Sequence, residues 1–384
     1  MPTLLVDATT LTANPKGVGK YAYEVITRLD RLLPASWTIT LIIFRGAVPE
    51  LNRTHRLSMI DIDWQSDLKL GLQTVPKLIR QSQPDLLLRL CDCVGCNYSV
   101  PVLTVCHDIN ELITRAQSVD LSMPRRLIYG LKEYFRIRAL RASSVVVCNS
   151  EFTRQQAVSR YGITDQSSLI GYCGISDNFY VTSKDDAVSR IRNAYGFENY
   201  LLCFATGDPR ENYGILPEVI AATKRKRLQK QYVIAGVRDG QAYAQELRIR
   251  LDEHSLIEGT DYVFVPFLGA SDRQRLCDIY AAADFYLELS LHEGFGMQLA
   301  EAMACGTHCL SPNHSALSEV GGSFVVHIDP VDAEAVADSI FAAYVQQLHL
   351  QDHSEQIAYT RKFSWDKTAT VIVEQVIKLG EMPR

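Results

Sequence analysis

Short apolar runs alternate with longer amphipathic stretches along most of the chain. In the first half, the runs predicted to be strands are Leu4–Asp7, Thr38–Phe44, Asp85–Arg89, Pro101–Cys106 and Ser144–Asn149. In the second half they are Tyr200–Ala205, Tyr232–Ala235, Tyr262–Val265, Asp284–Glu288, Thr307–Leu310 and Phe324–His327. Segments of helical period lie between many of them: Lys20–Leu32, Pro124–Arg141, Ile215–Thr223, Gln241–Glu253, Asp272–Ala282, Phe295–Ala304 and Val331–Val345. Strands that alternate with helices predict parallel sheets covered on both faces.

The pattern of strands and helices starts again near residue 200, after the polar stretch Val181–Asn193. A chain of 384 residues also exceeds what one hydrophobic core usually holds. We therefore predict an α/β protein with two doubly wound domains, 1–180 and 181–362, that face a cleft. In such sheets ligands bind beyond the carboxyl ends of the strands, so the residues that follow each strand are the candidate site residues.

Composition excludes several other classes of protein. The net charge of −5 argues against nucleic acid as a partner, because phosphate backbones select basic surfaces. No apolar run is long enough to span a membrane, and the first ten residues are expected to form a strand rather than a signal peptide. Ten cysteines without a secretion signal fit reduced thiols, so we expect a cytoplasmic protein.

One group of cysteines raises the question of a metal site. Cys91, Cys93 and Cys96 lie close together, and Cys106 and His107 follow. A zinc site usually needs paired spacings that return later in the chain, and the spacing here is one-sided. Buried free thiols are therefore the preferred interpretation, and we predict no metal site.

The segment 290–307 carries the clearest chemical signal. Gly294 and Gly296 form a loop after a predicted strand, Met297–Ala304 is rich in helix formers, and Gly306 suits a helix C-cap. The N-terminus of a helix presents backbone N–H groups and a positive dipole end, which together bind phosphate. Taken alone this signal is weak, because many α/β proteins show it.

Two carboxylates flank this turn, Glu293 and Glu301. Eight helical residues would separate them by roughly 12 Å, enough to bracket a diphosphate. Carboxylates accept hydrogen bonds from vicinal hydroxyls, so one could bind a sugar and the other a ribose. Their apolar neighbours predict a packed environment, in which an unpaired carboxylate would be costly.

The segment resembles the Glu-x7-Glu motif of retaining glycosyltransferases of family four, which have the GT-B fold. Further motifs resemble that family in the same order along nearly the whole chain. They are Gly17–Tyr21 after the first strand, Thr104–Asp108, Asn149–Thr153, Gly171–Phe179, and the loop Pro266–Gly269. The resemblance also implies that Phe363–Asp366 begins a final helix, which makes 363–384 a segment that returns to the first domain.

The resemblance gives these positions roles. Glu293 would bind the hydroxyls of the donor sugar, Glu301 the ribose, and the turn of Gly294, Phe295, Gly296 and Met297 the diphosphate. Gly17, Gly19 and Lys20 would approach the phosphates from the first domain, and His107 would donate a hydrogen bond to the donor sugar. Phe267 and Leu268 would lie beside the nucleotide base. The implied activity is metal-independent transfer of a hexose, in polysaccharide biosynthesis for example, with a nucleotide sugar as donor and no cofactor.

One departure from the family pattern concerns the cation that faces the leaving diphosphate. Family members usually carry a basic pair after the first strand of the second domain, where this chain has Arg210 and Glu211. Arg210 is a suitable cation, because a guanidinium can bind phosphate oxygens in pairs. If Arg210 is the sole cation, replacing Glu211 by lysine is expected to leave transfer intact or raise it.

Two carboxylates that act by double displacement lie only about 5 Å apart. Glu293 and Glu301 are expected to lie farther apart, so we predict an oxocarbenium-like reaction on one face of the sugar. Two other functions stay open. One is a sugar-nucleotide epimerase of the same architecture, and the other is a silent relative that binds a nucleotide sugar or a partner.

The segment Pro124–Arg141 carries six basic side chains and one acidic one, with apolar residues between them. Such a helix either packs its apolar stripe on the core or lies on an anionic membrane, here the inner membrane face. The partners expected from the sequence are a nucleotide-sugar donor and a glycan or lipid-linked acceptor, and no nucleic acid.

Overall fold

The computed structural model describes residues 1–12, 17–47, 51, 56–109, 122–180, 183–266, 268 and 272–381. Its contacts divide the chain into two compact units. Unit 1 comprises Met1–Gly174 and Phe363–Arg384, and unit 2 comprises Ile175–Lys362.

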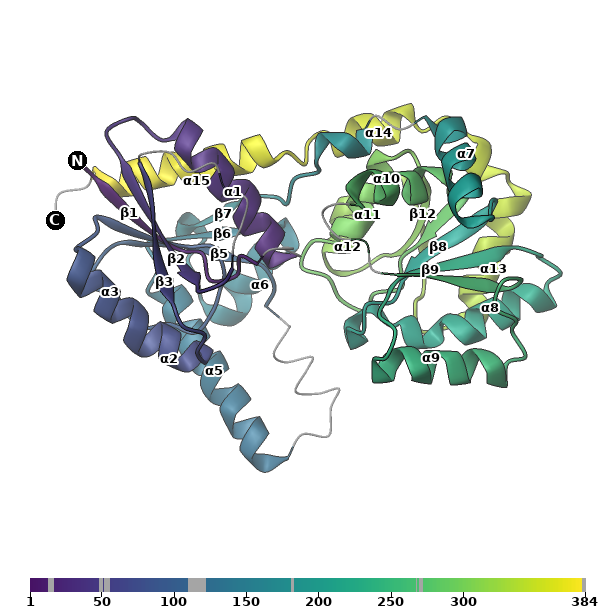
Figure 1. The fold of residues 1–384 in the computed structure, drawn as a ribbon, viewed down its shortest axis with the longest axis horizontal. Helices are drawn as coiled ribbons and strands as arrows, with labels where there is room; N and C mark the ends of the chain where they lie inside the picture. The colour runs from purple at the N-terminus through teal and green to yellow at the C-terminus, as the bar shows by residue number, and fades with distance from the viewer. Residues whose placement is uncertain are drawn as a thin grey trace. The chain divides into compact units, whose positions relative to one another are not determined.

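Unit 1 is built on a seven-stranded sheet in the order β3-β2-β1-β4-β5-β6-β7 (Figure 1). Every pairing in it is parallel. The central strands are buried along their whole length because helices cover both faces. The strands are β1 Thr3–Asp7, β2 Thr38–Phe44, β3 Leu57–Ile62, β4 Leu86–Arg89, β5 Val102–Cys106, β6 Val145–Cys148 and β7 Ser168–Ile170.

The helices of unit 1 are α1 Val18–Leu32, α2 Asp67–Lys69, α3 Val75–Ser82, α5 Met123–Arg141, α6 Glu151–Tyr161 and α15 Trp365–Gly380. The last of these, α15, packs against α1 although more than 300 residues separate them. Thr368 donates a hydrogen bond to the carbonyl of Tyr172, and Trp365 lies against Gly174 so closely that any side chain there would collide with it. The predicted return of the final helix to the first domain is confirmed.

Unit 2 is built on a six-stranded parallel sheet in the order β10-β9-β8-β11-β12-β13. Its strands are β8 Tyr200–Phe204, β9 Gln231–Val237, β10 Tyr262–Pro266, β11 Phe285–Leu287, β12 His308–Pro312 and β13 Val325–Ile328. Its helices are α7 Lys184–Tyr195, α8 Leu216–Arg225, α9 Ala242–Glu253, α10 Arg273–Ala282, α11 Met297–Ala304, α12 Ser315–Gly321, α13 Ala333–Val345 and α14 Ser354–Thr360. The prediction of two parallel-sheet, doubly wound α/β domains is therefore confirmed.

The structure differs from the sequence prediction where burial is low. Strand β3 lies at the edge of its sheet and has no fully buried residue, so its hydrophobic signal is weak. The polar stretch Val181–Asn193, interpreted from its composition as a break between domains, contains most of α7. Ser183 caps the start of that helix, its side chain accepting a hydrogen bond from the backbone of Asp186, and left-handed Gly196 caps its end.

None of the helices in the described part of the chain combines the length and the low polarity that a membrane-spanning helix needs.

Candidate functional site

The two loops that carry most of the predicted site residues of unit 2 leave neighbouring strands. In the strand order of unit 2 the direction of winding reverses between β8 and β11, and doubly wound sheets bind ligands at this reversal. One loop follows β8 and contains Arg210, and the other follows β11 and contains Glu293. The backbone N–H of Leu291 donates to the carbonyl of Arg210 over 2.8 Å, which joins the two loops.

The turn into α11 depends on Gly296. This residue is left-handed, with a φ of 91°, and a side chain on it would place Cβ 2.6 Å from Leu317 Cδ2. Gly294 and Phe295 just before it are buried. Helix α11 therefore begins at Met297 and not at Phe295 as predicted, because a left-handed residue cannot lie inside a helix. The helix does not use the N–H groups of its first turn, beginning with Met297, and these suit an anion.

Glu293 lies in the loop before this turn and is held by two backbone contacts. Its N–H donates to Ser315 Oγ over 3.3 Å, and its carbonyl accepts from the N–H of Ala316. Ser290 Oγ donates to the carboxylate over 3.3 Å. The start of α12 thus fixes the loop of Glu293, a contact that no sequence pattern predicts.

Glu301 lies on α11 and is buried, with 7% of its surface exposed. The hydroxyl of Tyr280 lies 3.4 Å from its Oε2. Burial and the neighbouring carboxylate of Glu301 raise the pKa of Tyr280 well above its ordinary value, so this tyrosine stays a donor. The two glutamates therefore occupy different surroundings, one in a loop and one in the packed face of a helix.

The side chain of Arg210 is paired within its own turn. Its Nε lies 3.2 Å from both carboxylate oxygens of Asp208, and Nη2 donates to Oδ2 over 2.8 Å. Asp208 Oδ1 also accepts from the backbone N–H of Arg210. Arg210 is thus presented by a fixed turn with part of its charge already compensated, and sequence reasoning missed Asp208.

The side chain of Glu211 is bonded within its own loop and is not exposed as a catalytic cation at this position would be. Its carboxylate accepts from the N–H of Thr206 over 2.7 Å and from Thr206 Oγ over 2.6 Å. Burial raises the pKa of Glu211, and the nearby carboxylate of Glu288 adds to the shift. Glu211 closes the turn after β8, so exchanging it for lysine would break two hydrogen bonds. The expectation that this exchange leaves transfer intact therefore needs revision.

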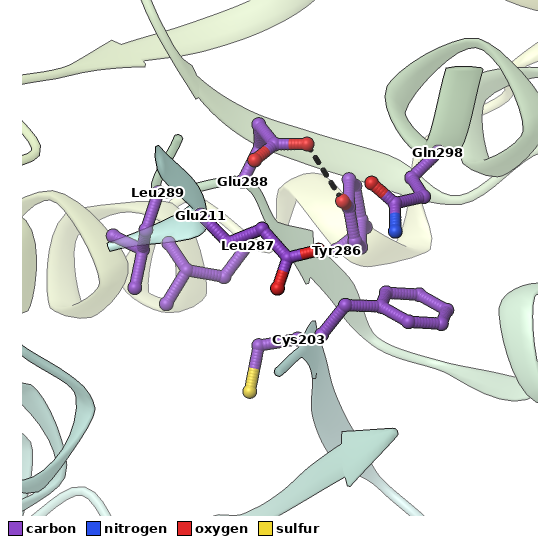
Figure 2. A pocket seen from close by; sticks show the side chains of 8 residues that line it. Cys203, Glu211, Tyr286, Leu287, Glu288, Leu289 and Gln298 are labelled. Carbon is purple, nitrogen blue, oxygen red and sulfur yellow. Dashed lines mark hydrogen bonds between the residues drawn. The ribbon is translucent and has the colours of Figure 1, made fainter. Parts of the chain in front are cut away.

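Glu211 also lines a small pocket beneath the two loops (Figure 2). Its volume is about 10 Å³, close to what one water molecule needs. Tyr286 donates to Glu288 Oε2 over 2.8 Å, and the N–H of Ser290 donates to Glu288 Oε1 over 3.0 Å. Too small for a sugar, this pocket is not the substrate site, and the hydrogen bonds of Glu288 fix β11 and the loop that follows it. Its lining residues are Cys203, Phe204, Glu211, Tyr286, Leu287, Glu288, Leu289 and Gln298.

In unit 1 the predicted site residues gather around the start of α1. Gly17 caps this helix with a φ of 45°, and Gly19 and Lys20 lie in its first turn. The ring of Tyr21 stands edge-on to the ring of His107, with centroids 4.8 Å apart. The structure therefore brings the glycine loop after β1 and the histidine after β5 to one place within this unit.

His107 is buried, and its Nε2 lies 2.8 Å from the carbonyl oxygen of Leu90. A carbonyl can only accept, so Nε2 must carry the hydrogen. In the neutral ring Nδ1 is then an acceptor, and His107 can donate through Nδ1 only as an imidazolium. Its predicted role as a donor to the sugar would require that protonated form.

Two predicted positions are only partly covered by the structure. Leu268 follows β10 and is half-buried, whereas Phe267 lies outside the described residues.

All ten cysteines are free thiols, and Cys91 and Cys106 are buried. Within the described ranges, no three or more histidine, cysteine or acidic side chains gather in a way that could hold a metal ion.

Family models match both units. The model described as glycosyl transferases group 1 matches residues 185–362, and the model described as Glycosyltransferase Family 4 matches residues 15–179. O-antigen chain mannosyltransferase B of Escherichia coli is 23% identical over 389 residues, which cover 92% of this chain and 94% of that protein. Mannosylfructose-phosphate synthase of Agrobacterium fabrum is 24% identical, covering 73% of this chain and 63% of that protein. Serotype-specific mannosyltransferase WbdA of Escherichia coli is 24% identical, but this chain spans only 33% of its length.

Solved structures of low sequence identity share the fold. Sucrose-phosphate synthase from Thermosynechococcus elongatus aligns with a TM-score of 0.72 at 16% identity, covering 99% of each chain. Anabaena Alr3699/HepE in complex with UDP-glucose aligns with a TM-score of 0.70 at 17% identity, covering 98% of this chain and 99% of the other.

Proposed function

The chain is a glycosyltransferase of the GT-B type and of the family-four kind, and on that premise we propose that it transfers a hexose from a nucleoside diphosphate sugar with retention of anomeric configuration. The acceptor is a glycan, a lipid-linked sugar or a small molecule. Because curated relatives are named mannosyltransferases and one solved relative holds UDP-glucose, nucleotide-linked mannose and UDP-glucose are the first donors to test.

The single observation that carries the proposal is the turn of Gly296 into α11. The first-turn N–H groups and the helix dipole offer a fixed site for a diphosphate, at the strand reversal where doubly wound sheets bind ligands. Such preorganised donors stabilise charge that grows as the glycosidic bond breaks. We assign Glu301 to the ribose and Glu293 to the hydroxyls of the transferred sugar.

The leaving diphosphate also needs a cation, and Arg210 is our candidate. Its backbone carbonyl accepts a hydrogen bond from the N–H of Leu291, in the loop of Glu293, and this hydrogen bond connects the two loops. The guanidinium would exchange part of its contact with Asp208 for the phosphate oxygens, because a carboxylate and a phosphate both offer a pair of acceptor oxygens. Lys20 and His107 of unit 1 are assigned to the donor as well.

We propose that the reaction needs no metal ion and no cofactor, because helix N–H groups and Arg210 supply the positive charge. Retention would proceed on one face of the sugar without a covalent intermediate. Double displacement needs two carboxylates about 5 Å apart across the anomeric carbon. Glu293 and Glu301 are assigned instead to the two ends of the donor.

The test is a panel of nucleotide sugars added to the purified protein in the presence of a chelator, with the melting temperature as the first measurement. A cognate donor at a hundredfold excess over its Kd should stabilise the protein by about 2.7 kcal/mol. Donor hydrolysis or transfer measured in the same samples then separates an enzyme from a binder. A loss of activity that only added metal restores would contradict the metal-free mechanism.

A second candidate is a catalytically silent relative that binds a nucleotide sugar. Two observations favour it, the compensated charge of Arg210 and the absence of a second cation at position 211. Stabilisation by a donor without hydrolysis or transfer to any acceptor would support this candidate.

A further inference from the structure

Helix α5 of unit 1 has two halves with opposite surroundings. In the inner half Arg136, Ala139 and Leu140 are buried. Arg136 donates to the carbonyl of Asp92 over 3.1 Å and to the carbonyl of Asp108, so it ties α5 to the loops after β4 and β5. The inner half is therefore firmly anchored in the unit.

The outer half, Met123–Tyr134, exposes its apolar side chains. It extends away from the sheet of unit 1 (Figure 1). The stripe consists of four side chains that follow one another at helical spacing, with Ile128 beside it: Met123, Leu127, Leu131 and Tyr134. Their exposed fractions are large: Met123 79%, Leu127 75%, Ile128 49%, Leu131 44% and Tyr134 56%. A surface helix normally turns such a stripe to the core, so this one marks a contact surface.

The exposed charges that the outer half itself carries are positive. Arg125 and Arg126 are exposed on the outer half. The one acidic residue of the helix, Glu133, is largely covered and bonded to Arg136. The outer half therefore presents apolar and cationic groups and no exposed carboxylate of its own.

An exposed tryptophan lies in the segment that is paired with α5. Trp64 is 81% exposed and lies three residues before Asp67, whose carboxylate pairs with Lys132 of α5 over 2.7 Å. Tryptophan is enriched where protein meets the headgroup level of a membrane, because its ring is apolar and its N–H is polar. The pair of Asp67 and Lys132 thus links the segment of Trp64 to the outer half of α5.

We propose that the outer half of α5 and Trp64, the α5 surface, dock this protein on an anionic lipid surface. Twelve helical residues extend about 18 Å, too short to cross a bilayer, so the helix would lie in the plane of the interface. The stripe would enter the boundary between headgroups and acyl chains, while Arg125 and Arg126 would meet the lipid phosphates. This inference does not depend on the proposed activity, and its test measures binding alone.

The experiment is co-sedimentation of the full chain with vesicles of phosphatidylcholine, with or without phosphatidylglycerol. We expect binding to the anionic vesicles that weakens as salt rises. Exchanging Arg125 and Arg126 for alanine should weaken that binding roughly ten- to thirtyfold, since each basic residue contributes about a fivefold factor near such a surface. Leu127→Asp with Leu131→Asp should reduce it at least about tenfold.

The matched control carries Ile249→Asp and Leu350→Asp, two exposed apolar positions of unit 2. It should bind vesicles like the wild type. All the exchanged side chains are exposed, so the melting temperatures should stay close together, and a variant that unfolds is recognised by that measurement.

Tryptophan fluorescence gives a second readout. Trp37 and Trp365 are buried, each 3% exposed, so Trp64 is the accessible one of the three tryptophans. Brominated lipids should quench the emission of the wild type and leave Trp64→Phe unquenched. If the anionic vesicles do not bind, or the α5 variants bind as well as the control, the proposal is wrong. It is equally overturned if light scattering finds a dimer that Leu127→Asp dissociates, because the surface would then join two copies.

Discussion

At the scale of single residues, the two glutamates beside α11 are expected to separate binding from turnover. Glu301 is buried on the helix, and its carboxylate is assigned to the ribose. Glu301→Gln should weaken nucleoside diphosphate binding roughly ten- to a hundredfold, because a charge-assisted acceptor becomes a neutral amide. Glu293→Gln should leave that affinity nearly unchanged and lower kcat, because its assigned contacts are to the sugar. Titration calorimetry and donor turnover measure the two effects.

The control for Glu301 is Tyr280→Phe, which removes the hydroxyl near the carboxylate and keeps the carboxylate itself. This variant should bind the nucleotide nearly as well as the wild type. Equal affinities of wild type and Glu301→Gln would refute the ribose assignment.

Arg210 should respond as the sequence alone indicates, whereas Glu211 should not. Arg210→Ala should lower turnover about a hundredfold or more, as the loss of a preorganised donor does elsewhere. Glu211→Lys should lower stability and gain no activity, because it removes two hydrogen bonds to Thr206. Thermal unfolding and donor turnover of both variants check this.

Glu211→Gln is the matched variant, because its amide oxygen can still accept from Thr206. It should lie between wild type and Glu211→Lys in melting temperature. A Glu211→Lys protein that is as stable as the wild type and turns over donor faster would mean that Glu211 is simply a missing cation.

At this scale the sequence predicted which residue types form the site, but not the hydrogen bonds that orient them. The glycines and the two glutamates stand in one contiguous segment, so their chemistry was readable. The pairing of Arg210 with Asp208 was not, because it needs the tight turn at 208–211, and the same turn aims Glu211 back at Thr206. The sequence could not show either which ring nitrogen of His107 carries the hydrogen, since its acceptor is a backbone carbonyl seventeen residues earlier.

At the scale of elements, the start of α11 should tolerate no side chain at Gly296. Gly296→Ala places Cβ against Leu317 and forces a left-handed alanine, which costs about 1–2 kcal/mol. Because the helix start must shift, nucleoside diphosphate affinity should fall roughly tenfold. Gly259→Ala is the control, since Gly259 has a similar φ of 85° and open space around it. Both variants should be destabilised, and a Gly296→Ala protein that binds like the control would contradict the diphosphate site.

Three histidines cluster near the ends of helices and strands in unit 2, and we expect this cluster to make the stability of the unit sensitive to acid. His308 at the start of β12 faces His353, with ring centroids 5.4 Å apart, and His349 lies nearby. Burial, with the two other histidines, lowers the pKa of His308 from 6.5 to about 4. The folded state therefore favours the neutral ring. This stability is complete above pH 6.5 and is lost as the pH falls toward 4.

The loss should approach about 2–3 kcal/mol for His308, discounted because the ring is partly exposed. Urea unfolding at several pH values checks it. His308→Leu cannot be protonated, so its stability should fall less steeply between pH 6.5 and 4 than that of the wild type. His327→Leu, which removes an exposed histidine of the same unit, should follow the wild-type slope. Equal slopes for all three proteins would rule out protonation of His308 as the cause of the loss of stability.

The elements that sequence patterns found are those that bury their residues. The runs around β4, β5 and β6 are continuous apolar stretches, typical of central parallel strands. Strand β7 is only three residues long, and helix α7 buries just Ala187 and Ile191, so neither gave a strong periodic signal. In α5 the apolar stripe was visible, but periodicity cannot tell whether such a stripe faces the core or solvent.

At the scale of the whole molecule, the restart of the strand–helix pattern near residue 200 marked two sheets of the same winding. The return of α15 to unit 1 came only from the family resemblance, because no local pattern says which core a terminal helix joins. Its contacts with Tyr172 and Gly174 explain why both ends of the chain belong to unit 1.

We propose that this protein moves a sugar from a nucleotide with retention and without metal. The most direct measurement is proton NMR of a cognate nucleotide sugar incubated with the protein and a chelator, recorded from the first minutes. We expect the first sugar product, transferred or hydrolysed, to keep the anomeric configuration of the donor, and Arg210→Ala to slow its appearance about a hundredfold. A first product of inverted configuration, or no turnover of any nucleotide sugar by the wild type, would contradict this proposal.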